Sequence, residues 1–100
     1  MKKIFVYGIL QKEHSAERFG IKDEYYLGRA TLYGYSRDGL TRISKSKRED
    51  DYVVGDIYEV DDDLEEKLFK FEHQFGYERE TTIPQIISDA TKYECISYIV

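Results

Sequence analysis

The residue of this chain best suited to chemistry is Glu72, in the segment LFKFEHQF at residues 68–75. Four apolar side chains recur around it at helical spacing and predict one buried helix face: those of Leu64, Leu68, Phe71 and Phe75. At about 100° per residue, Glu72 falls at the border of that face. Burial disfavours the charged form of a carboxyl group and raises its pKa, which suits a general acid or base near neutral pH.

Two interpretations of Glu72 remain open on the residues alone. In the first, it lies at the edge of the apolar face as a structural residue, with its carboxylate in water or paired with Arg79. In the second, it faces a pocket and transfers protons to and from a bound molecule.

Reactive side chains of other kinds are few. The single cysteine, Cys95, excludes an internal disulfide, and its apolar surroundings in the sequence predict a small buried side chain. The two histidines, His14 and His73, lack the spacing of metal ligands, and helix capping explains the acidic run at residues 61–63. We therefore expect a cytoplasmic protein without a metal site or a cofactor.

Length and charge exclude several classes of protein. One hundred residues make one domain, residues 1–100, because half that length would bury too small a core. The net charge of −5 argues against a nucleic-acid partner, which requires a basic face. No apolar run approaches the roughly 20 residues that span a bilayer, so we expect no membrane partner. The sequence does not indicate an oligomeric state.

The pattern of elements predicts an α+β fold. Extended segments are expected at residues 2–10, 24–36, 39–44, 52–60, 77–83 and 93–100, and a short helix or turn at residues 11–20. The first segment is apolar almost throughout, which is typical of a central strand buried on both faces. Gly28 and Gly34 mark bulges or bends in the second. One strong helix begins with Asp61 or Asp62 as its N-cap and ends at Gly76.

Three segments of the chain together resemble the γ-glutamylcyclotransferase-like superfamily, which includes the AIG2-like proteins. They are FVYGIL at residues 5–10, VVGDIYEVDDDLEEKLFKFEHQFGYERETTI at residues 53–83 and ECISYIV at residues 94–100. Their order and spacing match the family, whose first loop reads Tyr-Gly-Ser/Thr-Leu. The chain departs from the family pattern at Ile9 in place of Ser or Thr, at Phe69 in place of Asp and at His73 in place of Gly.

This resemblance implies a small mixed β-barrel or curved sheet flanked by helices. It also implies an enzyme of the cyclotransferase type, a lyase or acyltransferase, that takes a small γ-glutamyl amine or peptide as its substrate. Such an enzyme would release 5-oxoproline and an amine, with Glu72 as the general acid and base. The loop that receives the γ-glutamyl group would be Tyr7, Gly8, Ile9 and Leu10. Tyr77 and Tyr98 would line the pocket.

The chemistry of such a reaction suits a chain without a nucleophilic triad. The substrate's own α-amine attacks its γ-carbonyl group, so the protein has to supply binding, orientation and proton transfer. Three alternatives stay open. The first is a binding module that keeps the pocket without turnover. The second is an enzyme of the same fold that acts on a different amide, and the third is a structural interaction protein without a ligand.

Overall fold

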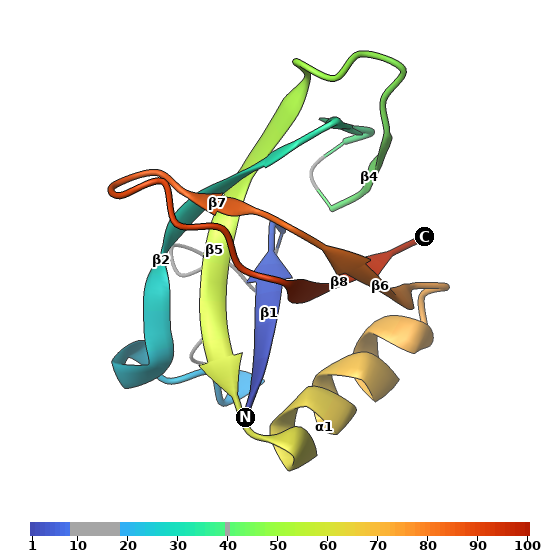
Figure 1. Ribbon diagram of the computed structural model, residues 1–100. Coiled ribbons are helices and arrows are strands. Elements are labelled where there is room, and N and C mark those ends of the chain that lie inside the picture. The colour runs from blue at the N-terminus through green and yellow to red at the C-terminus, as the bar shows by residue number, and fades with distance from the viewer. Residues whose placement is uncertain (9–18, 40) are drawn as a thin grey trace.

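A curved mixed β-sheet forms the main body of the computed structural model, which describes residues 1–8, 19–39 and 41–100 (Figure 1). Its six strands lie in the order β6 (Glu78–Thr82), β8 (Cys95–Ile99), β1 (Lys2–Val6), β5 (Tyr52–Val60), β2 (Tyr26–Tyr33) and β7 (Gln85–Ile86). β1 runs parallel to β8, and the other neighbouring strands are antiparallel. A separate two-stranded sheet pairs β3 (Tyr35–Arg37) with β4 (Ile43–Lys45).

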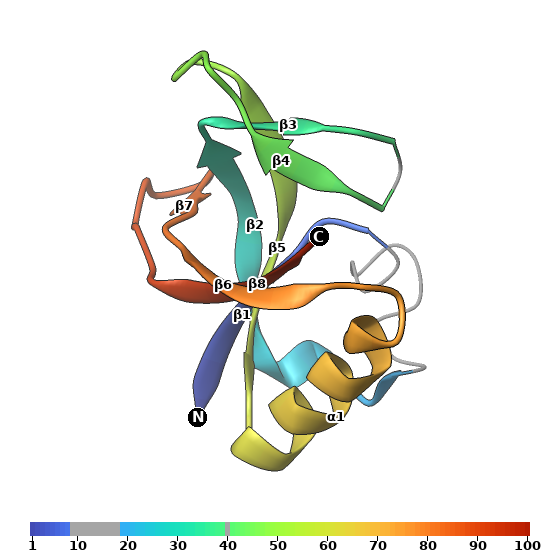
Figure 2. The same cartoon turned by 90° about the vertical axis from the view of Figure 1, so that its right-hand side faces the viewer.

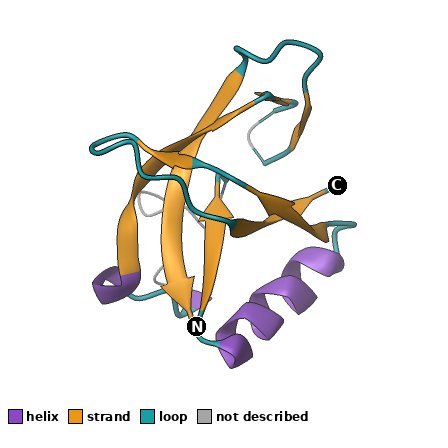
Figure 3. Ribbon diagram, in the orientation of Figure 1, coloured by secondary structure: helices purple, strands orange, loops and turns teal. Residues whose placement is uncertain are grey.

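The helices of the described ranges lie at the end of the molecule opposite β3 and β4 (Figure 2). The main one is α1 (Asp62–His73), and a short 3-10 helix, η2 (Asp23–Tyr25), precedes β2. Figure 3 shows how much of the chain is strand and loop beside this one long helix. The predicted α+β class is confirmed, with an open curved sheet. No helix in the described part of the chain is long and apolar enough to cross a membrane.

Most of the predicted strands form, with different boundaries. The segment predicted at residues 24–36 divides into η2, β2 and β3, with a register shift next to Gly28 and a positive φ of 82° at Gly34. The first strand ends at Val6 rather than at residue 10. The short strand β7 is an element that the sequence did not predict. Residues 9–18, which include Ile9, Leu10 and His14, lie outside the described residues.

The sheet carries an apolar cluster on each face, as the apolar first strand predicted. One face holds the side chains of Phe5, Tyr7, Ala30, Leu32, Tyr35, Ile43, Val53, Ile57, Ile86, Cys95 and Ile99. The other face, which α1 covers, holds Ile4, Val6, Ile21, Tyr58, Val60, Leu68, Tyr77 and Tyr98. Because side chains alternate along a strand, β1 and β5 contribute to both clusters and are buried on both sides.

Local signals set the two ends of α1. The side chain of Asp61 caps the first turn by accepting a hydrogen bond of 2.7 Å from the Leu64 backbone N–H group. After the helix, the Tyr77 N–H group donates to the Glu72 carbonyl and the Gly76 N–H group donates to the His73 carbonyl. These two bonds form a Schellman motif, and Gly76 adopts the positive φ of 90° that the motif requires.

The predicted buried face of the helix is wrong at one position. Phe75 is 58% exposed, whereas Glu65, a residue outside the predicted face, is fully buried. Helical spacing places Phe75 one turn beyond Phe71, but the helix ends at His73, so Phe75 lies in the closing turn, where it lines a pocket and stays exposed.

The buried Glu65 side chain joins α1 to three strands. Its carboxylate accepts two hydrogen bonds from Arg79 of β6, at 2.9 and 3.0 Å, and one of 3.0 Å from the Tyr98 hydroxyl of β8. The ammonium group of Lys2, in β1, lies 3.4 Å away. Burial alone would raise the pKa of Glu65, yet the hydrogen bonds from Arg79 and Tyr98 and the charge of Arg79 outweigh it and hold the pKa below its usual value. Arg79 therefore pairs with Glu65 and Glu66, and not with Glu72.

We expect Glu65→Ala to lower the free energy of unfolding by about 3–5 kcal/mol, because it leaves Arg79 and Tyr98 without their buried partner. The lowered pKa of Glu65 means that its stabilising contribution is present above the unfolded-state value of 4.5 and is lost as the pH falls through the lower folded-state value. Glu65→Gln should therefore weaken the loss of stability in acid. Urea unfolding at a series of pH values measures both effects, and equal acid sensitivity in wild type and Glu65→Gln would contradict this account.

Gly55 in β5 lets the backbone of β1 and the side chain of Phe5 approach β5 closely. A Cβ atom on Gly55 would lie 2.3 Å from the Val6 carbonyl oxygen and 2.8 Å from the ring of Phe5. The carbonyl belongs to the β1–β5 pairing, in which Val6 stands opposite Asp56, so it cannot move aside freely.

We expect Gly55→Ala to destabilise the protein by about 3 kcal/mol or more, because the added methyl group overlaps backbone. Val54→Ala, on the same strand with a half-buried side chain, serves as the control and should cost about 1 kcal/mol. Chemical unfolding of both variants tests this close approach, and a Gly55→Ala protein as stable as its control would disprove it.

Candidate active site

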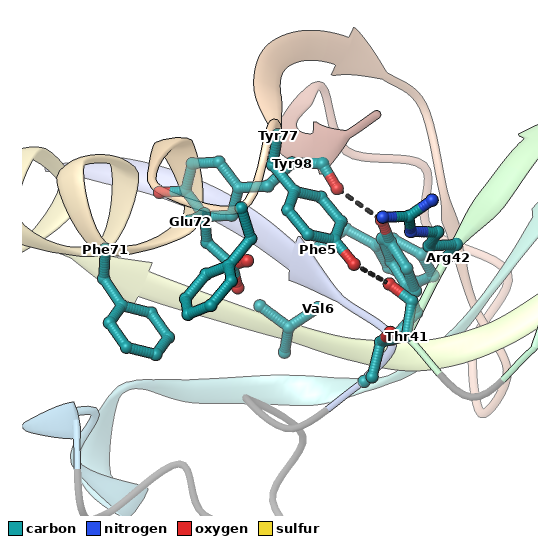
Figure 4. Close-up of a pocket in the computed structure, with 11 residues that line it drawn as sticks. Phe5, Val6, Thr41, Arg42, Phe71, Glu72, Tyr77 and Tyr98 are labelled. Atoms are coloured by element: carbon teal, nitrogen blue, oxygen red, sulfur yellow. Dashed lines mark hydrogen bonds between the residues drawn. The ribbon is translucent and has the colours of Figure 1, made fainter.

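A pocket of about 290 Å³ opens at the carboxyl end of β1 (Figure 4). Its floor is the segment from Phe5 to Gly8, and Tyr77 and Tyr98 form a wall beside it. The end of α1 and its closing turn supply Phe71, Glu72 and Phe75, and the segment before β4 supplies Thr41 and Arg42. Four segments far apart in the sequence therefore meet at this pocket.

Glu72 projects into the pocket from the last turn of α1. Its side chain is half-buried, and burial raises the pKa of its carboxyl group above the usual 4.5. Within the described residues, its carboxylate makes no hydrogen bond or ion pair. The backbone is fixed nevertheless, because the Glu72 carbonyl accepts hydrogen bonds from the N–H groups of Phe75 and Tyr77, at 2.9 and 3.3 Å. A fixed backbone with an unpaired carboxylate of raised pKa is suited to proton transfer.

Three tyrosines next to Glu72 are held by hydrogen bonds to backbone carbonyls or to Glu65. The Tyr7 hydroxyl donates to the Tyr98 carbonyl, the Tyr77 hydroxyl donates to the Thr41 carbonyl at 2.6 Å, and the Tyr98 hydroxyl donates to Glu65. Burial, together with the neighbouring Tyr77 and Glu72, raises the pKa of Tyr7 well above its usual value. Burial and the Glu65 carboxylate do the same for Tyr98. Both phenols are therefore neutral near pH 7.

The end of β1 is tied down by a side chain from β3. Arg37 donates hydrogen bonds from its guanidinium group to the carbonyl of Tyr7, at 2.8 Å, and to the carbonyl of Val54, at 3.0 Å. These bonds position the backbone at Tyr7 just before Gly8, which is half-buried at the pocket.

Five of the predicted site residues meet at this pocket: Tyr7, Gly8, Glu72, Tyr77 and Tyr98. Ile9 and Leu10 are outside the described residues. The sequence reasoning missed Phe5 and Val6, which read as core residues, and Thr41 and Arg42, which read as part of a short strand. The Tyr77–Thr41 hydrogen bond joins residues 36 positions apart, so no local pattern could have revealed that contact.

Two of the departures from the family pattern lie away from the pocket lining. The rings of Phe69 and His73 stack on each other with centroids 5.1 Å apart, and the Arg79 guanidinium group covers Phe69 at 3.8 Å. The His73 ring also lies 3.1 Å from the Glu78 carboxylate. Neither Phe69 nor His73 lines the pocket, and Phe69 packs against the apolar cluster that includes Leu68 and Tyr98.

Other reactive groups are placed for structure. Cys95 is 2% exposed, and burial raises the pKa of its thiol to about 12, so it is neither a thiolate nor accessible. The described residues contain no group of three or more His, Cys, Asp or Glu side chains that could hold a metal ion. The arrangement thus offers one carboxylate for acid–base chemistry, in a pocket lined largely by aromatic side chains.

Solved structures with the same fold include an AIG2-like protein from Mus musculus, with a TM-score of 0.75 and 22% identity over 100% of this chain and 77% of that chain. The uncharacterized protein PH0828 from Pyrococcus horikoshii gives a TM-score of 0.74 and 21% identity, over 99% of this chain and 77% of its own. A protein named gamma-glutamyl cyclotransferase gives a TM-score of 0.72 and 17% identity, over 99% of this chain and 66% of its own. At these identities the likeness shows the fold.

Sequence comparison with families extends this likeness over almost the whole chain. The profile of the family described as "Gamma-glutamyl cyclotransferase, AIG2-like" matches residues 4–100. A comparison with curated protein sequences gives no match. The match covers the strand before the pocket, the helix that carries Glu72 and the final strand that carries Tyr98. The chain therefore belongs to the gamma-glutamyl cyclotransferase, AIG2-like family.

Proposed function

We propose that this protein cleaves a γ-glutamyl amine or γ-glutamyl peptide by intramolecular attack, releasing 5-oxoproline and an amine, with Glu72 as the general acid and base. The observation that carries this proposal is the half-buried carboxylate of Glu72, with its raised pKa, in an aromatic-lined pocket of a chain from this family. A solved structure of the same fold is named gamma-glutamyl cyclotransferase, which supports the same reaction class.

The reaction requires one bond to form and one to break. The α-amine of the substrate attacks the γ-carbonyl carbon and closes a five-membered ring, while Glu72 accepts the proton that the amine loses. Glu72 then gives this proton to the leaving amine as its bond to the γ-carbon breaks. The carboxylate is regenerated, no water is consumed, and no protein nucleophile is needed.

Binding the substrate in a bent conformation supplies much of the acceleration. Well-oriented intramolecular reactions gain up to about 7–11 kcal/mol from proximity, and a positioned acid–base group adds roughly 10²–10⁴-fold. The side chains of Phe5, Tyr7 and Tyr77 surround the reacting groups with largely apolar surface. The oxyanion that develops at the γ-carbonyl group needs donors, and the backbone N–H group of Gly8, which lines the pocket after β1, is a candidate.

The main test is release of 5-oxoproline from a panel of γ-glutamyl amines and peptides, including the side-chain isopeptide γ-glutamyl-lysine. Glu72→Gln should lower the turnover rate at least about 10²-fold, while leaving substrate binding nearly intact. The control is Glu66→Gln, an exposed carboxylate on the same helix, which should keep full activity. Retained activity in Glu72→Gln would disprove its role. Thermal stabilisation by these compounds without turnover would identify a binding module instead.

The pH dependence of the rate should report the raised pKa of Glu72. The general base acts in its carboxylate form, so kcat/KM should fall in acid as Glu72 becomes protonated, with a midpoint above the usual 4.5. Steady-state rates across the acid range give this midpoint. A midpoint at or below 4.5 would show that burial does not tune this carboxyl group.

Burial of the Glu72 carboxylate should also lower the free energy of unfolding at a pH where this group is charged. The folded-state pKa of Glu72 is raised, so stability from this group is fully present below the unfolded-state value and is lost as the pH rises through the folded-state value. Glu72→Gln removes the buried charge, and we expect the variant to be more stable than wild type near pH 7.5 but not near pH 4. Urea unfolding at both pH values measures this difference. The exposed Glu49→Gln, as control, should change stability at neither pH.

A further inference from the structure

The pocket is lined by one anionic and one cationic side chain within the described residues, Glu72 and Arg42. The remaining lining side chains are aromatic, aliphatic or hydroxyl-bearing. Figure 4 shows Arg42 on the side of Thr41, across Phe5 from Glu72 and Phe71. The two charged groups line one pocket without forming an ion pair with each other, so each is available to a bound molecule.

Arg42 differs from the other arginines that the structure describes. Arg29 pairs with Asp56, Arg37 binds the backbone carbonyls at Tyr7 and Val54, and Arg79 binds Glu65 and Glu66. Arg48 pairs with Asp50. In residues 1–8, 19–39 and 41–100, the Arg42 guanidinium group has neither a hydrogen-bond partner nor an ion-pair partner. Among the arginines that the structure describes, the one that lines the pocket is therefore left for a ligand.

The backbone that carries Arg42 is held in place from both sides. The Tyr77 hydroxyl donates to the carbonyl of Thr41 at 2.6 Å, and the Asp38 N–H group donates to the carbonyl of Arg42 at 2.9 Å. The next residue, Ile43, is 2% exposed in the core. Little backbone order has to be gained when Arg42 binds a ligand, which favours affinity.

We propose that Arg42 binds the α-carboxylate of the γ-glutamyl group, an inference that rests on the proposed function. The head of this substrate carries an α-amine and an α-carboxylate on one carbon atom. An amine next to Glu72 is required for proton transfer, but a carboxylate at the same place would be repelled. A pocket with an anion on one side and a cation on the other matches this zwitterion, and the planar guanidinium group fits a carboxylate with two hydrogen bonds.

This arrangement makes Arg42 a specificity-determining residue. It selects γ-glutamyl compounds with a free α-carboxylate over analogues in which that group is an amide. It also fixes the orientation of the substrate, with the head between Glu72 and Arg42. The leaving amine then lies outside this pair of charges, so its own charge has little effect on binding at Arg42.

The test compares three substrates: γ-glutamyl-n-butylamide, the same compound with its α-carboxylate converted to a carboxamide, and γ-glutamyl-glycine. Arg42→Gln should lower kcat/KM about 10-fold for the first and third, mainly through KM, and leave the carboxamide unchanged. Arg42→Lys should recover part of the loss, since lysine keeps the charge without the planar fork. Arg48→Gln, an exposed arginine paired with Asp50 in another loop, is the matched control.

Two outcomes would overturn the proposal. An equal loss with the carboxylate and the carboxamide would mean that Arg42 acts only on the structure of the pocket. A loss confined to γ-glutamyl-glycine would place the carboxylate of the leaving group, and not the α-carboxylate, at Arg42.

Failure of the proposed function is recognised separately. If wild type turns over none of the three compounds, the binding of γ-glutamyl-n-butylamide and its carboxamide is measured by calorimetry. If wild type binds the carboxylate compound more tightly than the carboxamide, and Arg42→Gln loses this preference, then Arg42 binds the α-carboxylate in a protein without turnover. Equal affinity for both compounds in wild type overturns the proposal.

Discussion

The ion pair between Glu65 and Arg79 is the interaction on which the position of the candidate catalytic group depends. Helix α1 presents few fully buried apolar side chains to the sheet, with Leu68 the main one. The fully buried carboxylate of Glu65 adds a polar attachment, to Arg79 on β6, to Tyr98 on β8 and to Lys2 on β1. Because a helix is rigid over two turns, docking at Glu65 also places Glu72, seven residues further along the same face.

The two carboxyl groups on this face have opposite environments. Glu65 is surrounded by donors and a cation, and its pKa is lowered, so it stays charged and structural. Glu72 is half-buried without such partners, and its pKa is raised. Environments that push the pKa values of two similar groups apart distinguish a structural role from an acid–base role. Tyr98 connects the two sites, because its hydroxyl binds Glu65 while the residue also lines the pocket of Glu72.

The parts of this arrangement that depend on local chemistry could be predicted from the sequence. Asp61 as a helix cap, Gly76 in the closing turn and Gly28 at a bulge follow from preferences of single residues. The gathering of Tyr7, Glu72, Tyr77 and Tyr98 at one pocket was expected from the family resemblance and not from periodicity. The structure places these four together.

The sequence-based predictions that failed concern residues whose positions depend on contacts between distant segments. Helical spacing marked Phe75 as buried because it cannot show that the helix ends two residues earlier. Glu65 looked like an ordinary polar helix residue because its partner, Arg79, lies 14 positions away in another strand. Arg42 shows the same limit, since its place at the pocket depends on how β4 packs and on the Tyr77–Thr41 hydrogen bond.

The neutral tyrosines explain how one carboxyl group can serve both halves of a proton transfer. Burial raises the pKa values of Tyr7 and Tyr98 far above neutrality, so neither competes with Glu72 for a proton near pH 7. Their hydroxyl groups are already committed to the Tyr98 carbonyl and to Glu65. In the proposed reaction, a proton taken up at Glu72 therefore has no other acceptor among these tyrosines.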